Sequence, residues 1–156
     1  MNKLLSRKEY EELVKSFSDG YCPLCDLGKQ IVLGESDYWV WIANLSPYWK
    51  FHTMLIPKRH ISDFTDLKIE ELEDLQIFYK RIIKHFLSLG IKQDSGSNVD
   101  QFVLMIRTRF DSVENGSTYY KPVHLHLHLV PDKEGVDRFI IDPEAIEVDI
   151  QQISLK

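Results

Sequence analysis

The chain has 156 residues, a length that fits one domain built around a single core. Hydrophobic residues make up 44% and charged residues 28% of it, which excludes intrinsic disorder for the body of the chain. The formal net charge is −5, from 19 basic and 24 acidic residues, and this balance disfavours a protein that coats nucleic acid. We therefore expect residues 1–156 to form one globular domain with no nucleic-acid partner.

No stretch of the chain reaches the roughly 18 to 20 apolar residues that a membrane span needs, and the first ten residues, MNKLLSRKEY, are too charged for a secretory signal. The sequence thus predicts a cytoplasmic protein that does not bind membranes. Thiols stay reduced in that compartment, so Cys22 and Cys25, in the segment CPLC, are favoured as metal ligands or redox groups over a structural disulfide.

The first half of the chain predicts one helix and three strands. Ser6 and Glu9 form a capping-box pattern, which predicts a helix over 7–17 within an N-terminal segment, 1–20. Short β-branched and aromatic runs follow, and they predict strands at 31–33, 38–43 and 51–56. The first two are separated by Gly34 to Asp37 and resemble a hairpin, and Pro57 closes the third because proline cannot donate to a ladder.

The second half predicts a long helix and two more strands. Apolar residues recur at three- and four-residue spacing after Asp66 until Gly90, which predicts a helix with one core-facing side. Strands are expected at 102–107 and 123–130, and the segment 132–156 is expected to be a C-terminal extension. The predicted fold is α+β, an antiparallel sheet of about five strands with one long helix packed on it.

Three histidines alternate with leucines near the end of the domain, at His124, His126 and His128. Side chains alternate along a strand, so the three imidazoles are expected on one face while the leucines enter the core. A solvated histidine-rich face would give the same pattern, and so would a metal site, because imidazole is a common ligand of zinc and copper.

A second histidine cluster favours a further interpretation of the three alternating histidines. It reads His52-x-x-Leu-Ile-Pro-Lys-x-His60, and the sequence His-Leu-His-Leu-His-Leu-Val from His124 follows downstream. Together with Cys22 and Cys25, these segments make residues 22–131 resemble the histidine-triad (HIT) family of nucleotide hydrolases and transferases. The order strand, long helix, strand between the two clusters fits that family's fold.

The resemblance implies a covalent mechanism. His126 would attack the α-phosphorus of a nucleotide, and water would hydrolyse the resulting nucleotidyl-histidine. Imidazole suits this step because its ordinary pKa near 6.5 leaves it largely neutral at cellular pH. His128 and His52 would contact phosphate oxygens or protonate the leaving group, and Asn44 would hold the ribose hydroxyls. A histidine at position 128, where transferase branches tend to carry glutamine, favours hydrolysis.

The resemblance also implies a structural zinc site made of Cys22, Cys25, His60 and His124, a preferred tetrahedral ligand set. Metal-free reduced cysteines are the alternative, and so is a thioredoxin-like redox pair, although the expected strand and helix around such a pair are missing. Family members are typically homodimers, and the resemblance extends that expectation to this chain.

The sequence departs from the family just before the triad, where Tyr-Tyr-Lys-Pro-Val stands in place of Gly-Gln-(Ser/Thr)-Val. Lys121 replaces the hydroxyl, and with Arg107 or Arg109 it could neutralise phosphate charge. The substrate is expected to be a nucleoside phosphoramidate or a dinucleoside polyphosphate. Two alternatives stay open, namely a zinc-stabilised nucleotide-binding or sensor module without turnover, and a metalloenzyme that uses the three alternating histidines as ligands.

Overall fold

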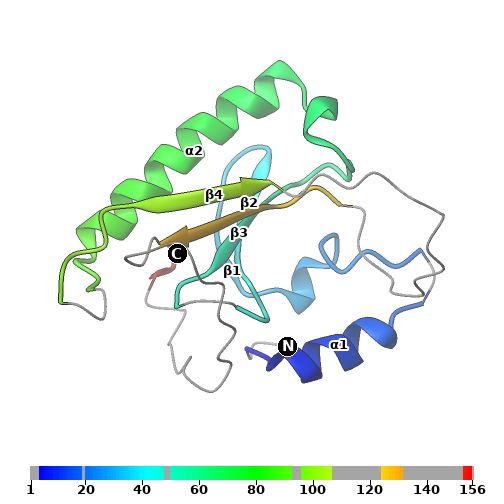
Figure 1. Cartoon of the computed structure of the whole chain (residues 1–156). Helices are drawn as coiled ribbons and strands as arrows, with labels where there is room; N and C mark the ends of the chain where they lie inside the picture. The colour runs from blue at the N-terminus through cyan, green and yellow to red at the C-terminus, as the bar shows by residue number, and fades with distance from the viewer. Residues whose placement is uncertain are drawn as a thin grey trace.

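The computed structural model describes residues 4–18, 20–47, 50–92, 96–106, 124–131 and 153–155. Its centre is a five-stranded antiparallel sheet with the strand order β1-β2-β3-β5-β4 (Figure 1). The strands are β1 (Val32–Glu35), β2 (Trp39–Ala43), β3 (Thr53–Pro57), β4 (Phe102–Ile106) and β5 (Leu127–Pro131). The order places β3 beside β5, so the two histidine segments that the sequence singled out become neighbours.

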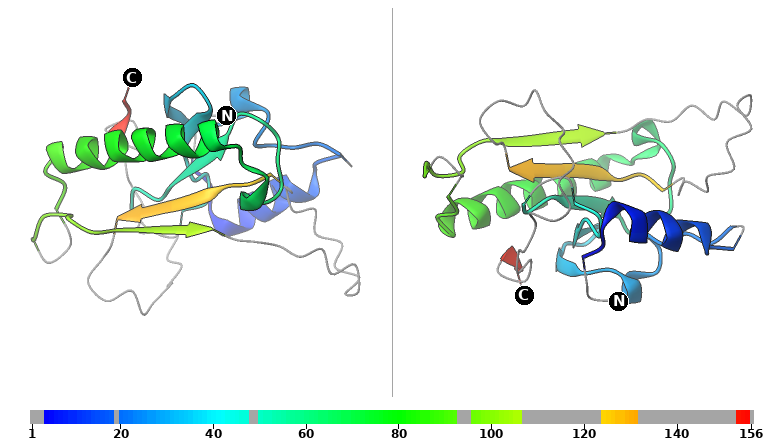
Figure 2. Two further views of the ribbon diagram at one scale, coloured as in Figure 1. Left: turned by 90° about the horizontal axis from the view of Figure 1, so that it is seen from above. Right: turned by 60° about the horizontal axis from the view of Figure 1, so that its bottom comes forward.

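The long helix α2 (Ile69–Ser88) covers one face of this sheet (Figures 1 and 2). Its buried apolar residues are Leu75, Phe78, Ile82 and Phe86, the three- and four-residue spacing of one helix side. They pack with Trp39 and Trp41 of β2 and with leucines of β3 and β5 in the main core. The predicted α+β architecture is confirmed.

The other face of the sheet carries a smaller apolar cluster made of Leu24, Val40, Ile42, Met54 and Ile56. The helix α1 (Arg7–Lys15) lies on this side, away from α2 (Figures 1 and 2). Its capping box is formed as predicted, with Ser6 and Glu9 satisfying each other's backbone amides. β2 is therefore buried on both faces, which explains why all five of its residues are apolar and buried.

Several boundaries differ from the predictions, and β3, for example, covers Thr53–Pro57 instead of 51–56. The helix α1 ends at Lys15 instead of residue 17, because the amides of Ser16 and Phe17 already bond three residues back. The first strand includes Gly34 and Glu35, which were expected in the turn. The last strand begins at Leu127 instead of residue 123.

A proline explains the late start of β5. The register pairs Thr53 with Leu129 and Leu55 with Leu127, so the next pair along this ladder would join Pro57 to Leu125. Pro57 has no amide hydrogen to donate, and Leu125 instead donates its amide to the carbonyl of Ile61 at 2.6 Å. His124 and His126 therefore precede the strand, although Leu125 is buried as predicted.

The C-terminal end returns to the first strand. Ile153 is fully buried in the main core, and the amide of Leu155 donates to the carbonyl of Leu33 at 2.7 Å. The predictions for 107–123 and most of 132–156 lie outside the described residues. Among the residues described, no helix has the length and apolarity required to cross a membrane.

Candidate active site and metal centre

Three polar side chains meet on the sheet face opposite α2. His52 Nε2 lies 2.9 Å from His128 Nδ1 and 3.3 Å from Asn44 Nδ2, and all three residues are buried. An amide nitrogen can only donate, so His52 Nε2 accepts from Asn44, and His128 Nδ1 carries the proton shared with His52. Phe51, just before His52, has a φ of 60°, a left-handed conformation that is costly for a bulky residue and concentrated at functional sites.

His126 lies beside this group, with its ring centroid 5.0 Å from that of His128. Its Nδ1 is 2.8 Å from the backbone carbonyl oxygen of His124. A carbonyl can only accept, so Nδ1 carries the proton and Nε2 keeps a lone pair. His126 is half-buried, and the hydrogen bond at Nδ1 holds its ring in place. The unprotonated, nucleophilic Nε2 lies on the other side of the ring.

A second cluster joins residues from three distant parts of the chain. One ligand atom from each of Cys22, Cys25, His60 and His124 lies within 4.8 Å of the other three. Cys25 Sγ is 3.1 Å from His60 Nδ1 and 3.4 Å from His124 Nδ1. A tetrahedral zinc ion with bonds of about 2.3 Å to sulfur and about 2.0 Å to nitrogen separates such atoms by about 3.5 Å. The donor set and its spacing fit zinc.

The tautomer of His124 suits the same role. Its Nε2 lies 3.0 Å from the carbonyl oxygen of Pro57, so Nε2 carries the proton and Nδ1 presents a lone pair to the two sulfur atoms. Burial, opposed by this hydrogen bond, lowers the pKa of His124 to about 4. The imidazole is therefore neutral at pH 7, the form that can ligate a metal.

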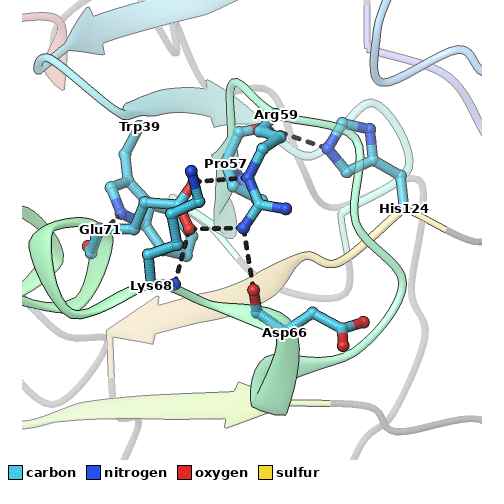
Figure 3. Close-up of polar contacts among 7 residues, drawn as sticks. All are labelled: Trp39, Pro57, Arg59, Asp66, Lys68, Glu71 and His124. Carbon is cyan, nitrogen blue, oxygen red and sulfur yellow. Dashed lines mark hydrogen bonds and ion pairs between the residues drawn. The ribbon is translucent and has the colours of Figure 1, made fainter.

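An ion pair between Arg59 and Glu71 joins the segment after β3 to α2 (Figure 3). Arg59 donates from Nε to Glu71 Oε1 at 2.9 Å and from Nη2 to Glu71 Oε2 at 2.7 Å, a bidentate geometry. Glu71 also accepts from the amide of Lys68 at the start of α2, and Arg59 donates to the carbonyl of Asp66. The Arg59 guanidinium lowers the pKa of Glu71 to about 2. The ion pair thus fastens the segment with His60 to α2.

A cavity of about 300 Å³ adjoins the histidines, at the lower end of the usual size of small-molecule sites. Asn44 and Leu45, after β2, line it together with Leu24, Met54 and side chains of α1. Asn44 also contacts His52, so the cavity and the histidine group share a wall.

Other predicted residues lie elsewhere. Trp41 belongs to the core against α2. His85 of α2 is half-buried with its ring edge against Trp41. Lys121, Arg107 and Arg109 lie outside the described residues. The sequence analysis did not predict the Arg59–Glu71 ion pair or the contribution of α1 to the cavity. In both cases the contacting residues are far apart in the chain, and no local sequence pattern indicates which residues meet.

A HIT domain family model matches residues 28–135, more than half of the chain, and the chain therefore belongs to the HIT domain family. A HIT-like protein of Mycobacterium tuberculosis is 26% identical over 95 residues, covering 60% of this chain and 56% of the relative. The bifunctional bis(5′-adenosyl)-triphosphatase/adenylylsulfatase FHIT of Arabidopsis thaliana is 29% identical over 94 residues, covering 60% and 45%. The chain thus spans about half the length of these relatives.

A solved structure shares the fold. A zinc-bound histidine triad family protein from Mycobacterium smegmatis superposes with a TM-score of 0.58 at 23% identity, covering 85% of this chain and 86% of that one. At this identity, the likeness shows the fold alone.

Proposed function

We propose that this protein hydrolyses a nucleotide at its α-phosphorus, with a nucleoside phosphoramidate or a dinucleoside polyphosphate as substrate. The observation that carries the proposal is the hydrogen bond from His126 Nδ1 to the carbonyl of His124, because it fixes Nε2 as the unprotonated nitrogen. The phosphatase activity in the name of the Arabidopsis relative supports the same class of substrate.

In the proposed reaction, His126 Nε2 forms a bond to the α-phosphorus while the bond from phosphorus to the leaving group breaks. The leaving group takes a proton from solvent, and His128, once it is also protonated at Nε2, donates to a phosphate oxygen while its Nδ1 stays bonded to His52. Water then attacks the phosphorus and gives a proton back to solvent, the bond between phosphorus and His126 breaks, and a nucleoside monophosphate leaves. Phosphoryl transfer depends mainly on positioning and on neutralising charge, which this hydrogen-bonded group of imidazoles supplies.

The test is turnover of an adenosine phosphoramidate and of diadenosine polyphosphates by wild-type protein and by His126→Ala. We expect the variant to lose AMP release while it still binds AMP, and intact mass should reveal a nucleotidyl adduct on wild-type protein only. His85→Gln, which alters an imidazole outside the site, is the matched control and should keep full activity. Normal activity of His126→Ala would refute the assignment.

A second candidate is a zinc-stabilised nucleotide-binding or sensor module without turnover. The observation that favours it is the sequence Tyr-Tyr-Lys-Pro-Val at 119–123, which has Lys121 in place of the Ser or Thr that the resemblance leads us to expect in a hydrolase. The same assay separates the two candidates, because a sensor would bind AMP but would not produce AMP by hydrolysis of either substrate.

We propose that Cys22, Cys25, His60 and His124 hold a structural zinc ion. The spacing of their ligand atoms supports this, and the solved structure from Mycobacterium smegmatis is described as zinc-bound. When bound, the zinc would tie the segment before β1 to the segments after β3 and before β5. Two thiolate ligands suit the reducing cytoplasm, where we propose that the protein resides. Elemental analysis of purified protein should give one zinc per chain, and Cys25→Ser should lower that content.

Two parts of the proposal concern residues or chains beyond the described site. Lys121 and Arg107 are proposed to bind the phosphates of the leaving group.

A homodimer is proposed through the edge strand β4, where Leu104 and Ile106 are each 40% exposed, since natural proteins usually cover an apolar sheet edge. Light scattering should give twice the monomer mass, and Ile106→Lys should reduce it to the monomer mass.

A further inference from the structure

The helix α1 presents its apolar side to the cavity beside the histidines. Tyr10 and Leu13 line this cavity from one side of α1, three residues apart, and Phe17, two residues after the helix ends, lines it as well. None of the residues of α1 is fully buried. Tyr10 packs against the main core, whereas Leu13 is half-buried at the cavity. An apolar helix side that borders a cavity gains burial when a ligand fills it.

The position of α1 is fixed relative to the active site. Just before the helix, the amide of Leu5 donates to the carbonyl of Leu45 at 2.7 Å, and Leu45 is the neighbour of Asn44. A nine-residue helix is too short to be stable alone, so such contacts decide where it lies. The family model begins only at residue 28, so α1 lies outside the matched domain.

The connection to the histidines indicates what the cavity holds. Asn44 lines the cavity and lies 3.3 Å from His52, which lies 2.9 Å from His128. A molecule whose phosphate reaches these histidines would place the group attached to that phosphate in the cavity. The α1 side of the cavity is apolar and aromatic, which suits a flat ring with apolar faces.

We propose that α1 and the residues just after it form a wall of the nucleobase site, with Leu13 and Phe17 in contact with the base. This inference rests on the proposed function, because the phosphate position defines where the base lies. Since α1 contacts the base and none of the reacting atoms, it contributes to binding equally before and during the reaction. Loss of this contact should raise KM and leave kcat unchanged.

The decisive variant is Leu13→Ala. Alanine is the best helix former, so α1 is retained while the apolar contact is removed. We expect KM for the nucleotide substrate to rise about tenfold, in line with partial loss of a leucine contact. Leu13→Met, which conserves volume, should restore most of the affinity. Glu12→Ala changes an exposed residue of the same helix and is the matched control.

Two measurements keep this inference separate from the proposed function. In the first, the four nucleoside 5′-monophosphates are titrated into wild-type and variant proteins, with no turnover required. Weaker binding of the preferred nucleotide by Leu13→Ala alone supports the inference, even if the wild-type protein hydrolyses nothing. Equal binding by both proteins overturns it, and so does the absence of binding to the wild-type protein.

In the second measurement, a nucleoside phosphoramidate carrying the preferred base is compared with ribose 5-phosphoramidate, which has no base. Leu13→Ala should raise KM for the first substrate about tenfold and leave both parameters for the second unchanged. A loss that is equal for both substrates would show that α1 supports the fold instead of the base, and would overturn the inference.

Discussion

The ion pair between Arg59 and Glu71 should contribute more to stability than its position near the surface suggests. The Glu71 side chain is only 4% exposed, whereas that of Arg59 is 41% exposed. The pKa of Glu71 falls from 4.5 to about 2, which corresponds to about 3.4 kcal/mol at 1.36 kcal/mol per pKa unit. Solvent screens the exposed guanidinium, so we halve this value and expect Glu71→Gln to cost about 1.5 to 2 kcal/mol at pH 7.

The cost should depend on pH with a definite sign. The pKa of Glu71 is lower in the folded protein, so the stabilisation is complete well above pH 4.5 and is lost as the pH falls toward 2. From the two pKa values, about a quarter of it is lost at pH 4 and about 60% at pH 3. The stability difference between wild-type protein and Glu71→Gln should shrink by these fractions.

Urea unfolding of both proteins at pH 7, 5, 4 and 3 measures this difference. The matched control is Glu35→Gln, which removes an ion pair with Lys58 whose side chains are 46% and 39% exposed. The control should cost at most about 0.5 kcal/mol. If Glu71→Gln cost no more than the control, or if its cost were the same at pH 7 and pH 3, the assigned role of the ion pair would be wrong.

Three further predictions follow from the packing and the sites. Ile153→Ala should destabilise the protein by about 2 to 4 kcal/mol in urea unfolding, because this side chain near the C-terminus is fully buried; a cost below 1 kcal/mol would contradict its place in the core. Removal of metal by a chelator should lower Tm of wild-type protein more than Tm of Cys25→Ser, as scanning calorimetry can measure, and equal shifts would count against the zinc site. Lys121→Ala should lower kcat/KM about tenfold or more on dinucleoside polyphosphates, whereas unchanged values on both substrate classes would reject its phosphate-binding role.

The sequence by itself determined the elements with a strong local period. The stripe of α2 and the capping box of α1 follow from contacts between residues three and four apart, and these are visible in one segment. The alternation of leucine with histidine likewise predicted that Leu125, Leu127 and Leu129 would be buried. The family also followed from local motifs, since each histidine cluster lies in a short continuous stretch.

The tertiary structure decided which of these residues meet. The pairing of β3 with β5 brings His52 to His128, and the missing amide of Pro57 ends that ladder, so that His124 can turn toward Cys22 and Cys25. The buried partner of Arg59 and the position of α1 over the cavity depend on packing between segments far apart in the chain. Periodicity records which side of an element is apolar, but only the sheet register and the packed core determine what that side faces.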